Sequence, residues 1–137
     1  MISSNSRRRY TAGFLLVLAF EFALLAVASP VSAEQRFPDV VDVKVTARGD
    51  RVYDFDVTVS SPYDTPTRYA DAFRVATESG QVLGERKLLH DHQGEQPFTR
   101  DLYGVRVPPS ITTVVLQAKD RKYGYGGKSI RASLPRY

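Results

Sequence analysis

The chain has 137 residues, a formal net charge of +4 at pH 7 and no cysteine. The lack of cysteine excludes thiol catalysis, thiolate metal sites and a disulfide framework within these residues. Basic and acidic residues are interspersed after residue 33, without a basic stripe or run, and this distribution argues against a nucleic-acid partner.

The N-terminal part of the chain has the composition of a secretion signal. Three arginines at positions 7–9 precede an apolar run over residues 12–31, and Val31 and Ala33 suit the −3 and −1 positions of a cleavage site. We predict that residues 1–33 are a signal peptide removed after Ala33. The remaining residues, 34–137, then form one domain in the periplasm or the medium, without a membrane span.

Two other interpretations of this segment stay open. The apolar run is nearly long enough for an uncleaved membrane anchor, which would place Glu21 inside the bilayer at a cost of roughly 2–4 kcal/mol. The consecutive arginines also resemble a twin-arginine export signal, although the strongly apolar run favours the general secretory route.

After the signal, apolar and polar residues alternate with a period of two, which is typical of strands half-buried in a sheet. The alternation is clearest in residues 41–46 and 53–59, which are joined by a turn at residues 48–50. We predict that they form a hairpin, with Asp54 and Asp56 on its solvent-facing side. The expected core positions of this hairpin are Val41, Val43, Val45, Tyr53, Phe55, Val57 and Val59.

The rest of the chain continues the pattern without a helical period. Residues 60–67 contain two prolines and predict a loop, and the Gly- and Tyr-rich residues 120–127 predict another. Seven short strands with a turn about every ten residues predict an antiparallel β-sandwich. The five strands after the hairpin are expected over residues 69–77, 82–89, 98–107 (short or bent), 111–119 and 128–134, with an irregular segment over 90–97.

The second half of the domain resembles a fibronectin type III or immunoglobulin-like domain. The residues that carry the resemblance are Phe98, the pair Pro108-Pro109, the strand Val114-Val115-Leu116-Gln117-Ala118 and the pair Gly126-Gly127. The resemblance implies an all-β fold, a seven-stranded immunoglobulin/fibronectin type III-like antiparallel β-sandwich over residues 34–137. Because this fold carries many functions, it implies no particular one.

A narrower resemblance lies in the segment Leu88-Leu89-His90-Asp91-His92-Gln93-Gly94-Glu95-Gln96-Pro97-Phe98-Thr99-Arg100. The segment is similar to a motif of small exported bacterial proteins with a sandwich fold. This resemblance implies the fold and export, and it supplies no activity.

His90 and His92 are the only histidines in the chain and lie two residues apart. In an extended segment, side chains at this spacing point to the same side, so both imidazoles can face one ion. With an oxygen from Glu95 or Asp91, such a set suits zinc or copper as a cofactor. The alternative is a polar loop in which the acidic residues only fix or charge the histidines.

The expected strand order brings three loops to one end of the sandwich. If the third strand runs away from that end, the fourth returns to it with the histidines, and loops 61–68 and 120–127 lie there too. Tyrosine provides contact area at low entropic cost, so the tyrosines of these loops suit a recognition surface; alternatively, they cover the end of the sandwich. The candidate partner-binding residues are Tyr63, Asp64, Arg121, Tyr123 and Tyr125.

No serine triad, phosphate-binding loop or dinucleotide fingerprint is recognisable in the sequence, so we expect a protein without catalysis. The leading hypothesis is an exported binding module of the bacterial cell envelope, which uses the loops around His90, His92 and residues 123–127 to bind a protein or an envelope component. One alternative is a metal-binding or metal-delivery protein that uses His90, His92 and Glu95. The other is a structural envelope protein without a local site.

Overall fold

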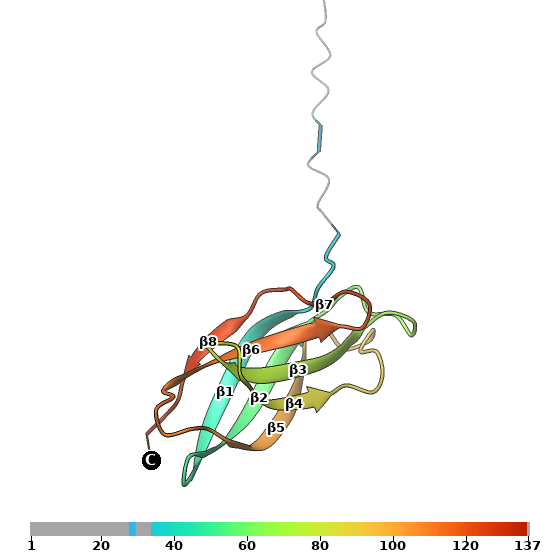
Figure 1. The fold of residues 1–137 in the computed structure, drawn as a ribbon. Helices are drawn as coiled ribbons and strands as arrows, with labels where there is room; N and C mark the ends of the chain where they lie inside the picture. The colour runs from blue at the N-terminus through green and yellow to red at the C-terminus, as the bar shows by residue number, and fades with distance from the viewer. Residues whose placement is uncertain (1–27, 30–33, 137) are drawn as a thin grey trace, which may run out of the picture. The chain divides into compact units, whose positions relative to one another are not determined.

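Two antiparallel β-sheets face each other in the computed structural model, which describes residues 28–29 and 34–136 (Figure 1). Apart from Ala28 and Ser29, the predicted secretion signal lies outside the described residues. Within the described part of the chain, no helix is long and apolar enough to cross a membrane. The first sheet has the order β1 (Asp39–Gly49), β2 (Val52–Ser60) and β5 (Phe98–Arg106). The second has the order β4 (Val82–Lys87), β3 (Ala70–Thr77), β6 (Thr113–Asp120) and β7 (Gly124–Tyr125), and β8 (Ile130–Ser133) also pairs with β6.

This strand order confirms the predicted antiparallel β-sandwich. The predicted final strand corresponds to β8, which pairs with residues 113–116 of β6, and the structure adds the short strand β7 within the predicted loop 120–127, where it pairs with Lys119 and Asp120. When β7 and β8 are taken as one interrupted strand, the first, second and fifth strands form one sheet and the remaining four form the other. This division resembles that of a seven-stranded immunoglobulin-like sandwich in which the fourth strand lies at the edge of the second sheet and not of the first.

The start of β1 causes the interruption between β7 and β8. The Val40 N–H donates to the Lys128 carbonyl at 2.9 Å, and Asp39 Oδ1 accepts from the Lys128 N–H at 2.7 Å. A side chain at Gly127 would overlap the carbonyl of Pro38, so only glycine allows this approach. The backbone around Lys128 therefore bonds to the start of β1 and closes one edge of the sandwich.

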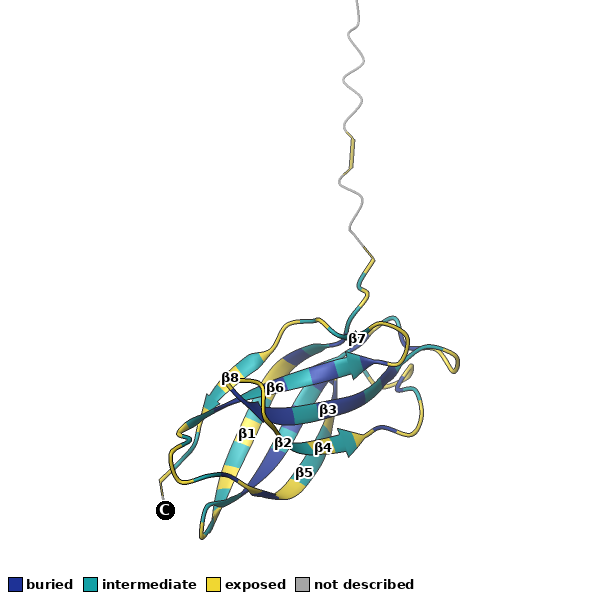
Figure 2. Ribbon diagram, viewed as in Figure 1, coloured by how far each residue is buried: buried dark blue, intermediate teal, exposed yellow. Residues whose placement is uncertain are grey.

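The core confirms most of the positions expected from the alternation (Figure 2). Phe55, Val57 and Val59 in β2 are fully buried, as are Phe73 and Val75 in β3. Each fully buried apolar side chain of this size stabilises the fold by about 1.5–3 kcal/mol. In β6, which pairs with β3 in the second sheet, the buried core residues are Val114, Leu116 and Ala118.

Two positions of the hairpin differ from the prediction. Val41 is 47% exposed, because a bulge between Val40 and Asp42 shifts the register and turns Val40 into the core instead. Asp54 is only 9% exposed, although it lies on the side predicted to face solvent. The bend in β5 brings the Gly104 N–H to within 2.9 Å of Asp54 Oδ1, and Arg48 Nε lies 2.7 Å from Asp54 Oδ2.

Candidate functional site

The prediction that three loops meet at one end of the sandwich is correct. Ala72 of β3 pairs with Lys87 of β4, and Ala70 pairs with Asp120 of β6, so β3 begins where β4 and β6 end. In Figure 1 the arrowheads of β4 and β6 point towards the same end. We call this the loop end; it comprises residues 61–69, 88–97 and 121–127, together with residues 34–38 before β1.

Asp64 joins the first two of these loops from the inside. Its side chain is buried, with 2% of the residue exposed. Asp64 Oδ1 accepts from the Ala70 N–H at 3.1 Å, and Oδ2 accepts from the His92 N–H at 3.0 Å. Backbone N–H donors stabilise a buried carboxylate that would otherwise be costly to desolvate. Asp64 therefore lies within the loop end, whereas the sequence suggested it for contact with a partner.

The Gln96 side chain fastens the same two loops a second time. Gln96 Oε1 accepts from the Ser61 N–H at 2.8 Å, and Gln96 Nε2 donates to Ser61 Oγ at 3.2 Å and to the His92 carbonyl at 3.1 Å. The Gln96–Pro97 peptide bond is cis. With Asp64, these contacts fix the backbone of His92 relative to the loop that follows β2.

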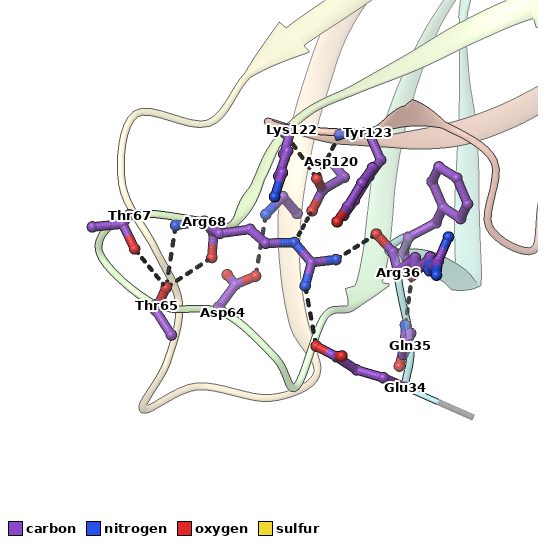
Figure 3. Close-up of polar contacts among 12 residues, drawn as sticks. Glu34, Gln35, Arg36, Asp64, Thr65, Thr67, Arg68, Asp120, Lys122 and Tyr123 are labelled. Atoms are coloured by element: carbon purple, nitrogen blue, oxygen red, sulfur yellow. Dashed lines mark hydrogen bonds and ion pairs between the residues drawn. The ribbon is translucent and has the colours of Figure 1, made fainter. Parts of the chain in front are cut away.

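Arg68 links the N-terminal segment to the end of β6 (Figure 3). Its guanidinium donates to the Arg36 carbonyl at 2.7 Å and lies 3.5 Å from Glu34 Oε1. On its other side, Arg68 Nε lies 3.4 Å from Oδ1 of Asp120, which is fully buried. Asp120 Oδ2 accepts from the N–H groups of Lys122 and Tyr123, both at 2.8 Å. This pair thus connects residues 34–36, the loop before β3 and the loop after β6.

Two tyrosines pack against the Arg68 guanidinium. Its central carbon lies 4.2 Å from the ring centroid of Tyr63 and 4.9 Å from that of Tyr123, within the range of cation–π attraction. Burial, and then the adjacent Asp120 carboxylate, raise the pKa of the Tyr63 phenol. The Tyr63 hydroxyl is buried and has no hydrogen-bond partner among the described residues. Tyr63 therefore contributes its ring to the interior of the loop end.

His90 and His92 lie side by side, with ring centroids 4.9 Å apart and planes tilted by 35°. The adjacency expected from their spacing is present, but their environments differ. His92 is buried and stacks on Phe98 at a centroid distance of 3.8 Å. His90 is exposed, and its Nδ1 lies 2.7 Å from the Asp91 carbonyl. Burial lowers the pKa of His92, and the neighbouring charges of Arg100 and His90 lower it further.

Glu95, the expected third ligand, is engaged elsewhere. Its two carboxylate oxygens lie 3.2 and 2.9 Å from the two terminal nitrogens of Arg100. The hydrogen bond with Arg100 lowers the pKa of Glu95. Among the described residues, no group of three or more His, Cys, Asp or Glu side chains could hold a metal ion. The zinc or copper site at His90, His92 and Glu95 stays a prediction.

Tyr125 and Arg121 point over the outer face of the second sheet. The Arg74 guanidinium lies 3.8 Å from the Tyr125 ring centroid, and Tyr125 Oη donates to Glu85 Oε2 at 3.1 Å. Tyr125 thus extends from β7 across the sheet to β4. Arg121 is exposed and lies 5.4 Å from the ring centroid of Tyr69.

The surface of the loop end is formed by a few exposed side chains around this interior. Leu89 is 84% exposed and Tyr123 is 44% exposed, and both count among the larger exposed apolar residues. His90 and Arg121 are also exposed. Of the five predicted partner-binding residues, the structure places Tyr123 and Arg121 on the surface, Tyr63 and Tyr125 partly buried, and Asp64 in the interior.

Several residues that hold this site together were not recognised from the sequence as anchors. Asp120 is the last residue of a strand and precedes a glycine-containing turn, a position where aspartate often accepts from the N–H groups of the next residues. That signal could have identified Asp120. Arg68 and Gln96 carry no comparable local signal, because their partners are distant in sequence.

Comparison with curated proteins finds a relative that shares part of this chain. No protein-family model and no solved structure matches the chain. The chain is 40% identical over 95 residues to a protein of Halomicrobium mukohataei named "Putative lipoprotein", and the match covers 69% of this chain and 46% of that relative. The chain therefore spans less than half the length of this relative. The name describes a protein of the cell envelope, which agrees with the predicted export.

Proposed function

We propose that this protein is a non-catalytic binding module of the cell envelope and that it recognises its partner through the loop end. One observation carries the proposal: exposed Leu89, His90, Arg121 and Tyr123 stand on loops that are fastened to one another by hydrogen bonds and by the ion pair of Arg68 with buried Asp120. Loops that are ordered before binding lose less conformational entropy when they bind. An arrangement of this kind suits recognition of a protein or another envelope component.

The absence of catalysis is part of the proposal. The two buried carboxylates of the loop end, those of Asp64 and Asp120, are engaged in structure, because both accept from backbone N–H groups. A general base has to reach a substrate proton within hydrogen-bond distance, and these carboxylates are held inside the loop end instead.

Site-specific photo-crosslinking in the host that exports the protein tests the proposal. A photoreactive amino acid at Tyr123 or Arg121 is expected to give an adduct of one defined mass with an envelope component. The matched control is Tyr103, which is 59% exposed but lies on β5, away from the loop end. The same adduct from the control position, or no adduct from either test position, would argue against recognition by this end.

Metal handling is the second candidate, and the adjacency of the two imidazoles favours it. In this case zinc or copper would bind His90 and His92, with Glu95 as the third ligand after release from Arg100. Calorimetric titration of the exported protein, purified without a histidine tag, is expected to show one-to-one binding that a His90→Ala/His92→Ala variant loses. If the untagged protein takes up neither ion above background, the two histidines belong to the loop structure alone.

A further inference from the structure

A hollow of about 340 Å³ opens at the loop end beside the histidines. It lies between β4 and β5, the adjoining edge strands of the two sheets, and it is close to the smallest volumes typical of small-molecule sites, about 300–1,000 Å³. Farther along these strands the sheets approach closely, since a side chain at Gly84 would lie 3.2 Å from Val105. The hollow therefore opens where the two edge strands separate towards the loops.

The lining of the hollow is basic. Five of its side chains carry a cationic or imidazole group, and none of its lining residues is an aspartate or a glutamate. Lys87 is exposed and has no ion-pair partner among the described residues. The five nitrogen-bearing side chains are Arg86, Lys87, His90, His92 and Arg100.

Arg86 and Arg100 are held in position by carboxylate and carbonyl oxygens beside the hollow. Arg86 donates to the carbonyl and to the carboxylate of Asp101, each at 3.0 Å, which joins the two sheets. Arg100 faces the Glu95 carboxylate with both terminal nitrogens. The Glu95 side chain is 56% exposed, so this carboxylate lies on the rim and can be displaced. The Arg100 guanidinium already presents the paired donor geometry that suits a carboxylate or a phosphate.

A further feature of the hollow suits a ligand with an apolar portion. Leu89 lines the hollow and is 84% exposed, which leaves an apolar side chain at the rim for the uncharged part of a ligand to cover.

We propose that this hollow binds a phosphate group, carried by a ligand whose apolar portion packs on Leu89. When Glu95 is displaced, three permanent cations and the Asp101 carboxylate remain around the hollow, which leaves an excess of two positive charges to match a phosphate monoester of about −2 charge. The proposal rests on the proposed function, because it names the ligand class of the loop end.

Glu95 competes with the phosphate for Arg100, which gives the test its sharpest variant. Inorganic phosphate is titrated into the exported, purified protein at constant ionic strength, with chloride as the balancing ion and backbone amide shifts as the signal. The Glu95→Gln variant is expected to bind phosphate about three- to tenfold more tightly, and Arg100→Gln about tenfold more weakly. Glu78→Gln is the matched control, because it removes one negative charge from the distant pair with Arg131 and is expected to leave the affinity unchanged.

A second variant protects the test against misfolding. If Arg100→Gln loses its native circular dichroism spectrum, Lys87→Gln replaces it, with the same expected direction. Saturable binding that responds to Glu95 and to one of these cations supports the proposal. The proposal is overturned if phosphate shifts the amides no more than chloride does, or if the Arg100 and Lys87 variants bind as tightly as the unchanged protein.

Vesicles distinguish the two sources of the phosphate group. Sedimentation with phosphatidic acid vesicles, whose headgroup is a phosphate monoester, that fails with phosphatidylcholine vesicles and with Arg100→Gln identifies a lipid headgroup. Binding of inorganic phosphate without vesicle binding identifies a soluble phosphate ester. Crosslinking from Tyr123 is independent of both measurements. The phosphate site can therefore fail while the binding module stands, and the two failures are distinguishable.

Discussion

Each end of the sandwich is fastened by one arginine, and the two arginines use different partners. At the loop end, Arg68 contacts the carboxylates of Glu34 and Asp120. At the opposite end, Arg51 donates to backbone carbonyls, at 2.8 Å to Pro108 and also to Ile111, and its other terminal nitrogen donates to the Tyr53 hydroxyl at 3.2 Å. We call this second end the turn end; it comprises residues 49–51, 78–81 and 107–112.

This comparison shows how one residue type stabilises two ends of one fold with different consequences. The partners of Arg51 are uncharged, so its contacts are insensitive to the protonation of an acid and only weakly sensitive to salt. The partners of Arg68 include a fully buried carboxylate and an exposed one, so the loop end depends on charge. Of the two arginines compared, the one at the end with the candidate site is therefore the one whose contribution to stability solution conditions can alter.

The largest expected effect comes from removing the buried charge of the loop end. Asp120→Ala leaves Arg68 Nε without its ion-pair partner and two backbone N–H groups without their acceptor, and breaking such a buried arrangement costs about 3–5 kcal/mol in the free energy of unfolding. Urea unfolding followed by circular dichroism measures the loss. Asp120→Asn keeps one side-chain oxygen as an acceptor and is expected to lose less. Equal losses in the two variants would show that packing, rather than the acceptor, matters at this position.

The second prediction compares the two arginines directly. Arg68→Met and Arg51→Met are each expected to lower the free energy of unfolding by about 2–4 kcal/mol, because each leaves several acceptors unpaired. The loss caused by Arg68→Met should shrink when unfolding is repeated in 1 M salt, because the Debye length is then about 3 Å and the exposed pair with Glu34 is screened. The loss caused by Arg51→Met should stay the same. If both losses responded equally to salt, the proposed difference between the ends would be wrong.

The strands were predictable because their information is local. The period-two alternation in β2 and β6 identified the buried residues from Tyr53 to Val59 and from Val114 to Ala118 without knowledge of the partner strands. The same alternation failed at Val41, since a bulge depends on how two strands register. The alternation also failed to predict the burial of Asp54. The Asp54 carboxylate accepts from the Gly104 N–H in the bend of β5, and this contact too depends on a second strand.

The location of the candidate site could be predicted from the sequence, but the contacts between its residues could not. Counting antiparallel strands was sufficient to bring His92, loop 61–68 and loop 120–127 to one end. Arg68 is separated from Glu34 by 34 positions in the sequence and from Asp120 by 52. No local sequence pattern predicts contacts between residues so far apart. For the same reason, Glu95 was expected to serve a metal, whereas the strand that follows its loop supplies Arg100 as its partner.

A third prediction concerns the contact of residues 34–38 with the loop after β6, where Gly127 packs against Pro38. Gly127→Ala is expected to destabilise the protein by about 1–3 kcal/mol, because the new methyl group would overlap the Pro38 carbonyl and backbone atoms cannot easily move away. Gly94→Ala is the matched control, since it lies in a neighbouring loop with open space around its α-carbon, and it should change stability little. Thermal unfolding of the two variants measures both effects. A destabilised Gly94 variant would indicate that these loops tolerate no added side chain at all.

The smallest expected effect concerns Tyr125, whose hydroxyl donates to Glu85 across the second sheet. Burial, and then the hydrogen bond to Glu85, raise the pKa of Tyr125 to about 12, above the value of about 10 for an unfolded chain. Because the folded state holds this proton more tightly, the contribution of Tyr125 to stability is complete below pH 10 and is lost as the pH rises from about 10 to about 12.

Tyr125→Phe removes that titration, so its unfolding midpoint should fall less steeply than that of the unchanged protein between pH 10 and 12. Tyr123→Phe is the control, because the Tyr123 hydroxyl makes no hydrogen bond among the described residues. A flatter profile in both variants would mean that the alkaline loss arises from the tyrosines in general. A flatter profile in Tyr125→Phe alone would show that the hydrogen bond from Tyr125 to Glu85 stabilises the fold across β6 and β3. A partner bound at Tyr123 would then lie next to the sheet face that this bond stabilises.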